Sequence, residues 1–93
     1  MHPLLAARFA PNDLGRTRFG LSTGRRLGNA VVRNRVRRRL RAVLRALGPR
    51  MAPGWDVLIV CRPPITAASY AEIRAALERT LRGGGILPDG NGP

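Results

Sequence analysis

An apolar stripe and a dense set of arginines share one segment of this chain, residues 30–47. At about 100° per residue, the apolar positions fall on one face of a helix and most of the arginines on the other. The stripe consists of Val32, Val36, Leu40, Val43, Leu44 and Leu47. Asn29 precedes it as a candidate N-cap, and Gly48-Pro49 follows it as a stop signal. The segment therefore predicts a helix from Ala30 to Leu47 that docks by its apolar face.

The polar face of this helix has no acidic residue to neutralise its arginines. Arginines recur there at i, i+4 spacing, at which like charges repel by a few tenths of a kcal/mol per pair. No Asp or Glu lies between Asp13 and Asp56. A solvated basic face is the ordinary explanation of a charge run, but Asn34 between two arginines and the missing Glu favour a surface that binds a polyanion. The candidate binding residues are Arg25, Arg26, Arg33, Asn34, Arg35, Arg37, Arg38, Arg41 and Arg45.

The composition agrees with a nucleic-acid partner. The 93 residues include 17 basic and five acidic side chains, which gives a formal net charge of +12 and a pI of about 12.0. Every basic residue is Arg, which suits bidentate contacts to phosphate. The chain is also rich in Ala, Gly, Pro and Leu, so a G+C-rich coding bias explains the missing Lys equally well.

Three segments predict β-strands in a chain long enough for one small domain. Leu4 to Phe9 and Arg16 to Thr23 flank the turn residues of Pro11–Gly15 and predict a β-hairpin. Trp55 to Arg62 has an almost continuous apolar centre and ends before two prolines. This third strand is expected to be central and buried.

A second helix is predicted from Tyr70 to Arg82. Ser69 and Glu72 fit a capping box at its start, and three glycines follow its end. The order strand-strand-helix-strand-helix predicts the α+β class, a small α/β sandwich with helices on one short sheet. We expect a single domain over residues 1–82 and a flexible tail over residues 83–93.

Few side chains are suited to catalysis or metal binding. Cys61 is the only cysteine and lies in an apolar run, where a buried small hydrophobe is the favoured role. His2 is the only histidine and lies next to the first residue. The five carboxylates show no spacing typical of a metal site or an acid–base pair. We therefore predict no catalytic residue and no metal ligand. No apolar stretch approaches the roughly 20 residues needed to cross a membrane, which favours a cytoplasmic location.

Residues 18–41, which read RFGLSTGRRLGNAVVRNRVRRRLR, closely resemble the signature of the bacterial ribonuclease P protein component. The hallmark of that family is an Arg-Asn-Arg motif followed by further basic residues. The motif is met here by Arg33-Asn34-Arg35 with Arg37, Arg38 and Arg41. The strand from Trp55 and the helix from Ser69-Tyr70 also follow the family's order. The resemblance extends over roughly residues 4 to 82.

The resemblance implies the protein subunit of a ribonucleoprotein endonuclease that removes the 5′ leader from precursor tRNA. The implied partners are the ribonuclease P RNA and precursor tRNA, with no membrane and no obligate protein partner. The RNA subunit would perform the chemistry with Mg²⁺ that it mainly holds itself, while a cleft on the sheet would receive the single-stranded leader. The implied fold is similar to a small-subunit ribosomal protein domain and to domain IV of elongation factor G. It includes a left-handed strand-helix-strand crossover, against the usual rule.

The beginning of the chain departs from the family pattern. Family members start with a further basic segment and a helix whose aromatic side chains help to form the leader cleft, whereas this chain starts inside the region that would follow. We expect either a start codon placed too far downstream or a truncated form. Phe9 and Phe19 are the remaining candidates for the cleft, and each is also a candidate core residue.

Two other hypotheses use the same basic helix. One is an RNA-binding protein of ribosomal type with no part in cleavage, which the Arg-Asn-Arg match disfavours. The other is a DNA-binding helix, which ranks last because no partner helix precedes the basic segment. The sequence leaves open which arginine contacts which nucleotide, whether Asn34 bonds RNA or its own backbone, and how many copies join one RNA.

Overall fold

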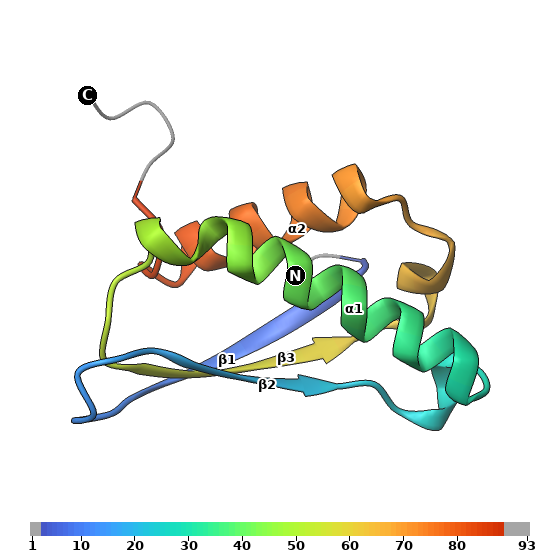
Figure 1. Cartoon of the computed structure of the whole chain (residues 1–93), viewed down its shortest axis with the longest axis horizontal. Helices are drawn as coiled ribbons and strands as arrows, with labels where there is room; N and C mark the ends of the chain where they lie inside the picture. The colour runs from blue at the N-terminus through green and yellow to red at the C-terminus, as the bar shows by residue number, and fades with distance from the viewer. Residues whose placement is uncertain (1–2, 89–93) are drawn as a thin grey trace.

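Two helices lie over one face of a three-stranded sheet (Figure 1). The computed structural model describes residues 3–88. Short 3-10 turns at Arg25–Leu27, Gly48–Arg50 and Pro63–Ala67 join the main elements. These elements are β1 (Leu5–Pro11), β2 (Arg18–Ser22), α1 (Ala30–Leu47), β3 (Trp55–Cys61) and α2 (Tyr70–Gly83). The predicted α+β class and element order are confirmed.

The pairing of the strands corrects one prediction. The sheet order is β1-β3-β2, so β3 separates the two strands that were expected to form a hairpin. β1 runs antiparallel to β3, and β2 runs parallel to it. Residues 12–17 are long enough to cross two strand spacings of about 4.8 Å each, and Asn12 N–H bonds Gly54 C=O at 2.8 Å on the way. The most apolar strand thereby takes the central position, as predicted.

The connection between the parallel strands runs through α1. β2 and β3 point the same way, and α1 crosses above the sheet between them (Figure 1). Parallel neighbours need such a crossover, because the chain must return to the end of the sheet where the first strand began before it can start the second. The crossover is left-handed, as the family resemblance implied, and is an exception to the usual right-handed rule.

The core fills the space between the helices and the sheet. The predicted apolar stripe of α1 is buried from Val36 onward, whereas Val32 is only half-buried. The largest fully buried side chains from the main elements are Leu5, Val36, Leu40, Val43, Leu47, Val57, Ile59, Ile73, Leu77 and Leu81. The single cysteine, Cys61, is also buried, as its apolar neighbours predicted.

The chain after α2 packs against the domain instead of forming a flexible tail. Ile86 and Leu87 are buried, and Ala52 N–H bonds Ile86 C=O at 2.8 Å. Gly84 lies so close to the ring of Phe9 that a Cβ there would be 2.4 Å from Cζ. The expectation of a flexible tail is therefore wrong for residues 84–88, because Ile86 and Leu87 pack into the core. Two apolar residues are too few to show a period in the sequence. Residues 89–93 lie outside the described residues.

Candidate nucleic-acid interface

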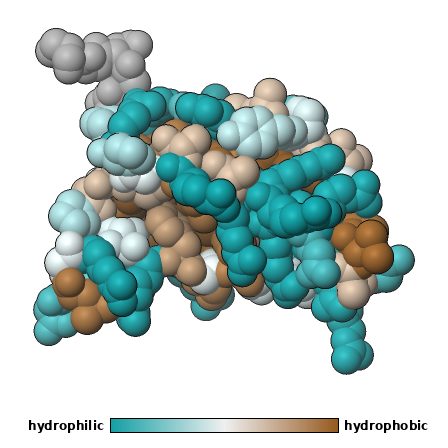
Figure 2. Space-filling view, in the orientation of Figure 1, coloured by the Kyte–Doolittle hydropathy of each residue, from teal (hydrophilic) through white to brown (hydrophobic). Residues whose placement is uncertain are grey.

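The basic helix is anchored at its first turn. The Asn29 side chain accepts a hydrogen bond from Val32 N–H at 3.0 Å, which confirms the predicted N-cap. With its apolar stripe buried, α1 turns its remaining side chains outward, and hydrophilic side chains gather over it (Figure 2). Arg33 and Arg37 are partly buried at its edges. The other predicted binding residues are exposed, namely Arg25, Arg26, Asn34, Arg35, Arg38, Arg41 and Arg45.

The arginines of α1 have no carboxylate partner within residues 3–88. The three ion pairs found there join Arg18 to Asp56 and join Arg74 and Arg82 to Glu78. A shallow hollow on the outer face of α1 is lined by Val31, Asn34, Arg37, Arg38 and Arg41. Uncompensated guanidinium groups around a hollow form a surface suited to a phosphate backbone.

Hydrogen bonds separate the arginines of α1 into two kinds. Asn34 Oδ1 accepts from Arg37 Nη1 at 3.2 Å, so the Asn side chain orients a neighbouring guanidinium and not its own backbone. Arg39 Nη1 donates to Ala68 C=O at 2.9 Å and ties α1 to the segment before α2. The Arg39 side chain therefore makes a hydrogen bond within the domain. No local pattern predicts this bond, because its partners are 29 residues apart.

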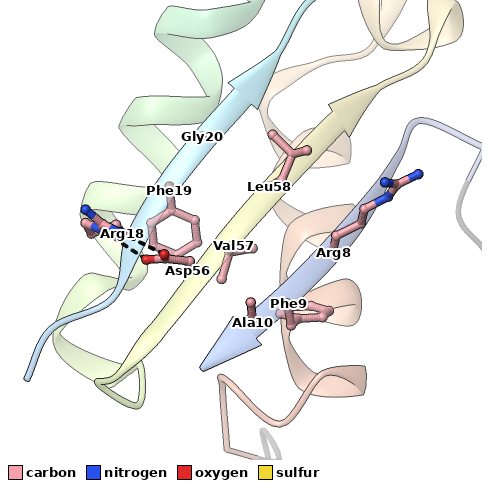
Figure 3. A pocket seen from close by; sticks show the side chains of 9 residues that line it. All are labelled: Arg8, Phe9, Ala10, Arg18, Phe19, Gly20, Asp56, Val57 and Leu58. Carbon is pink, nitrogen blue, oxygen red and sulfur yellow. Dashed lines mark hydrogen bonds and ion pairs between the residues drawn. The ribbon is translucent and has the colours of Figure 1, made fainter. Parts of the chain in front are cut away.

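The other face of the sheet, which no helix covers, carries both charged and apolar residues (Figures 1 and 3). Side chains alternate along each strand, and the register places Arg8, Leu58 and Gly20 in one row across the three strands. The next row holds Ala10, Asp56 and Arg18. These two rows line a hollow of about 490 Å³. We call this surface, formed by Arg8, Ala10, Arg18, Gly20, Asp56 and Leu58, the open sheet face.

The two phenylalanines suggested for a cleft belong mainly to the opposite side. Phe9 and Phe19 both stand in register with Val57, which is buried beneath the helices. Both are partly buried and pack against the core, although they also border the hollow. The sequence reasoning missed Leu58, Arg8 and Arg18 as residues of the open sheet face. Side chains alternate between the two faces of a strand, so the residues on either side of Val57, which is buried, could have been predicted to face outward.

Hydrogen bonding and burial shift the pKa of several groups. Hydrogen bonds from Arg18 and Asn12 lower the pKa of Asp56 to about 2. Burial raises the pKa of the Cys61 thiol to about 11. Bonds within the α2 cap lower the pKa of Glu72, and the adjacent arginines lower that of Glu78. These carboxylates are therefore held in the charged form by nearby donors, which makes them poor general bases.

Two further findings concern residues 3–88 only. No three His, Cys, Asp or Glu side chains within this range come together as a possible metal site. Neither α1 nor α2 has the length and apolar character of a membrane-spanning helix, and no other helix in this range does.

The fold and the arginine-rich helix define a small basic protein of the nucleic-acid-binding class. The Ribonuclease P family model matches residues 2–83. The ribonuclease P protein component of Roseiflexus castenholzii is 40% identical over 85 residues, which cover 90% of this chain and 70% of that protein. The one from Geobacillus kaustophilus is 41% identical over 76 residues, which cover 82% of this chain and 63% of that protein. This chain belongs to the ribonuclease P protein family.

Solved structures show the same fold. The RNase P protein of Staphylococcus aureus superimposes with a TM-score of 0.83 at 22% identity, over 95% of this chain and 81% of that one. The RNase P protein of Thermotoga maritima gives a TM-score of 0.82 at 21% identity, over 89% of this chain and 79% of that one. The sheet and both helices are therefore arranged as in these proteins.

Proposed function

We propose that this chain is the subunit of ribonuclease P that binds the catalytic RNA through α1 and assists removal of the 5′ leader from precursor tRNA. The observation that carries the proposal is the set of exposed α1 arginines without a carboxylate partner in the described chain. Such a surface gains most from a partner with closely spaced phosphates. Membership in the ribonuclease P protein family supports the ribonuclease P RNA as that partner.

The proposal assigns individual roles to the basic residues. Arg39 is left out because it is bonded to Ala68, and Asn34 serves chiefly to orient Arg37. Exposed arginines at the start of α1 add to the positive end of the helix dipole, which favours a phosphate there. The proposed RNA-binding residues are Arg25, Arg26, Arg33, Asn34, Arg35, Arg37, Arg38, Arg41 and Arg45, among which Asn34 acts mainly through Arg37.

The chemistry is assigned to the RNA subunit, with Mg²⁺ held mainly by that RNA. Three of the five side-chain carboxylates support this division, because Glu72 bonds within the α2 cap, Glu78 bonds two arginines, and Asp56 bonds Arg18 and Asn12. The protein would act by screening phosphate charge, which lowers the Mg²⁺ concentration that the RNA needs. The open sheet face is the proposed surface for the single-stranded leader. The cytoplasmic location stays a prediction.

The test is cleavage of a precursor tRNA by a bacterial ribonuclease P RNA at low Mg²⁺, with and without this chain. We expect a clear gain in the cleavage rate when the chain is added, and no gain from the variant with Arg35, Arg38 and Arg41 all changed to Gln. A longer ribonuclease P protein from a relative serves as the positive control. If that control stimulates cleavage and this chain binds the RNA without stimulating, the chain is an RNA-binding protein without a part in cleavage.

A further inference from the structure

A chain of hydrogen bonds on the open sheet face holds one arginine in place. Asp56 Oδ1 accepts from Arg18 Nε at 2.9 Å, and Asp56 Oδ2 accepts from Arg18 Nη2 at 2.8 Å (Figure 3). Asn12 Nδ2 donates to Asp56 Oδ1 at 2.9 Å, while Asn12 Oδ1 accepts from Leu14 N–H at 2.9 Å. The turn after β1 therefore orients Asn12, Asn12 orients Asp56, and Asp56 orients Arg18.

The bidentate pair leaves Arg18 able to bind another acceptor. Its Nε and Nη2 are engaged by Asp56, whereas the N–H groups of Nη1 are not part of this pair. The Arg18 side chain is 54% exposed, so an incoming group can reach it. A guanidinium already fixed in one geometry loses less conformational entropy when it binds a phosphate than a free side chain does.

The surroundings of Arg18 suit a single strand of RNA. Leu58 is 40% exposed on the central strand, and Gly20 beside it adds no side chain that would cover it. Arg8 lies on the other side of Leu58. Two strand spacings and two residues along the strand place the Cα atoms of Arg8 and Arg18 about 12 Å apart, with Leu58 between them. Such a surface offers an apolar contact for an unpaired base or ribose and a cation on each side for phosphates.

We propose that Asp56 is a positioning residue, which fixes Arg18 so that its guanidinium binds a phosphate of the single-stranded leader next to Leu58. This inference rests on the proposed function and adds to it one phosphate subsite and the residue that orients it. It predicts that the loss of a negative charge weakens RNA binding, which is the opposite of the usual effect. Removing a carboxylate from an RNA-binding surface should tighten binding by simple electrostatics, whereas removing a positioning carboxylate should weaken it.

The experiment compares Asp56→Asn with Asp13→Asn in the holoenzyme reconstituted with a ribonuclease P RNA. Both substitutions raise the net charge by one, but Asp13 lies exposed in the loop before β2 and takes no part in the Arg18 group. Affinity is measured for a precursor tRNA that carries a single-stranded leader and for mature tRNA that lacks one. We expect Asp56→Asn to weaken binding of the precursor by about threefold to tenfold, which is less than the loss of a whole charge-assisted contact because Arg18 itself remains. Binding of mature tRNA should stay at the wild-type value. Asp13→Asn should leave both affinities unchanged or slightly tighter, as simple electrostatics requires.

A double-mutant cycle separates positioning from a general loss of folding. If Asp56 acts through Arg18, then Asp56→Asn causes no further loss in a chain that already carries Arg18→Gln. Additive losses, an equal loss for mature tRNA, or precursor binding as tight as wild type would each overturn the inference while leaving the proposed function intact. A wild-type chain that gives the RNA no gain in precursor binding or cleavage would overturn both.

Discussion

The two helices of this domain use arginine in opposite ways. On α2, Glu78 bonds Arg74 at 3.0 Å and Arg82 at 3.1 Å, so one carboxylate at i, i+4 spacing serves two guanidinium groups. On α1, no acidic residue occurs at all. Both helices bury an apolar stripe against the same sheet. The difference therefore lies in the outward faces. The charges of α2 are largely neutralised by its own side chains, whereas α1 keeps the positive charge that we propose binds RNA.

The starts of the two helices differ in the same way. Ser69 and Glu72 form a complete capping box on α2, which places a negative charge near the positive end of the helix dipole. α1 has the single Asn29 cap, no acidic residue in its first turn, and Arg25 and Arg26 in the turn before it. A helix start of this kind is less stable alone and more favourable for a bound phosphate.

The largest expected effect is on RNA affinity and its salt dependence. If about five phosphates are engaged, log affinity should fall against log salt with a slope near −4. Changing Arg35, Arg38 and Arg41 together to Gln should reduce that slope by about 2 to 3. The matched change of Arg74, Arg79 and Arg82 to Gln on α2 should leave it nearly unaltered. Filter binding to ribonuclease P RNA over a range of salt concentrations gives both slopes, and equal changes would remove the distinction between the helices.

The helix caps provide the next effect, on stability. Ser69→Ala should lower the free energy of unfolding by about 1 kcal/mol, because it leaves a helix-start amide without its acceptor. Asn29→Ala should cost a similar amount in the free protein, and an RNA phosphate bound at the start of α1 should restore part of this loss by accepting from the uncapped amides. Urea denaturation with and without RNA measures both. A Ser69→Ala loss that RNA offsets better than the Asn29→Ala loss would contradict the assignment of RNA to α1.

A smaller effect is expected when α2 is made to resemble α1. Glu78→Gln releases Arg74 and Arg82 and should lower the free energy of unfolding by about 0.5 kcal/mol, since such pairs are weak at a surface. The two released arginines should raise non-specific RNA affinity slightly. Chemical denaturation and competition with unrelated RNA measure these quantities. A fall in non-specific RNA affinity would show that the ion pairs on α2 are themselves part of an RNA surface.

The smallest effect concerns acid, because the carboxylates involved are near the surface and screened by solvent. The pKa values of Asp56, Glu72 and Glu78 are lower in the folded chain than their ordinary values. A lowered folded-state pKa contributes stability above the unfolded pKa and loses it as the pH falls through the folded pKa. Tm should therefore fall between about pH 4.5 and about pH 2. Asp56→Asn should make this fall smaller, and an identical fall in that variant would contradict the role of the Arg18 pair.

Local patterns predicted the helices well. The apolar period and the Asn29 and Gly48 signals gave α1 its observed bounds, and the capping box gave the start of α2. Strand pairing was not predictable in the same way, because the turn chemistry of Pro11–Gly15 shows that the chain turns but not which strand becomes the neighbour. The burial of Ile86 and Leu87 was missed because two apolar residues are too few to show a period.

The candidate site also has a part that local patterns predicted and a part that depends on strand pairing. Exposure of the α1 arginines followed from helical geometry, while their contacts with RNA stay a prediction. The group of Asn12, Arg18 and Asp56 joins residues 38 and 44 positions apart, through a sheet order that the sequence did not reveal. Tertiary hydrogen bonds of this kind become visible only once the strands are placed.

The distance of each helix from bound RNA can be compared at one matched position on α1 and on α2. Ala42 on α1 and Ala75 on α2 are both exposed, whereas the native Cys61 is buried and its raised pKa keeps it unreactive. An iron chelate attached to Ala42→Cys or to Ala75→Cys would cut any RNA held near it. We predict that the α1 probe cuts ribonuclease P RNA at defined nucleotides while the α2 probe cuts little. Strong, defined cuts from the α2 probe and none from the α1 probe would contradict it.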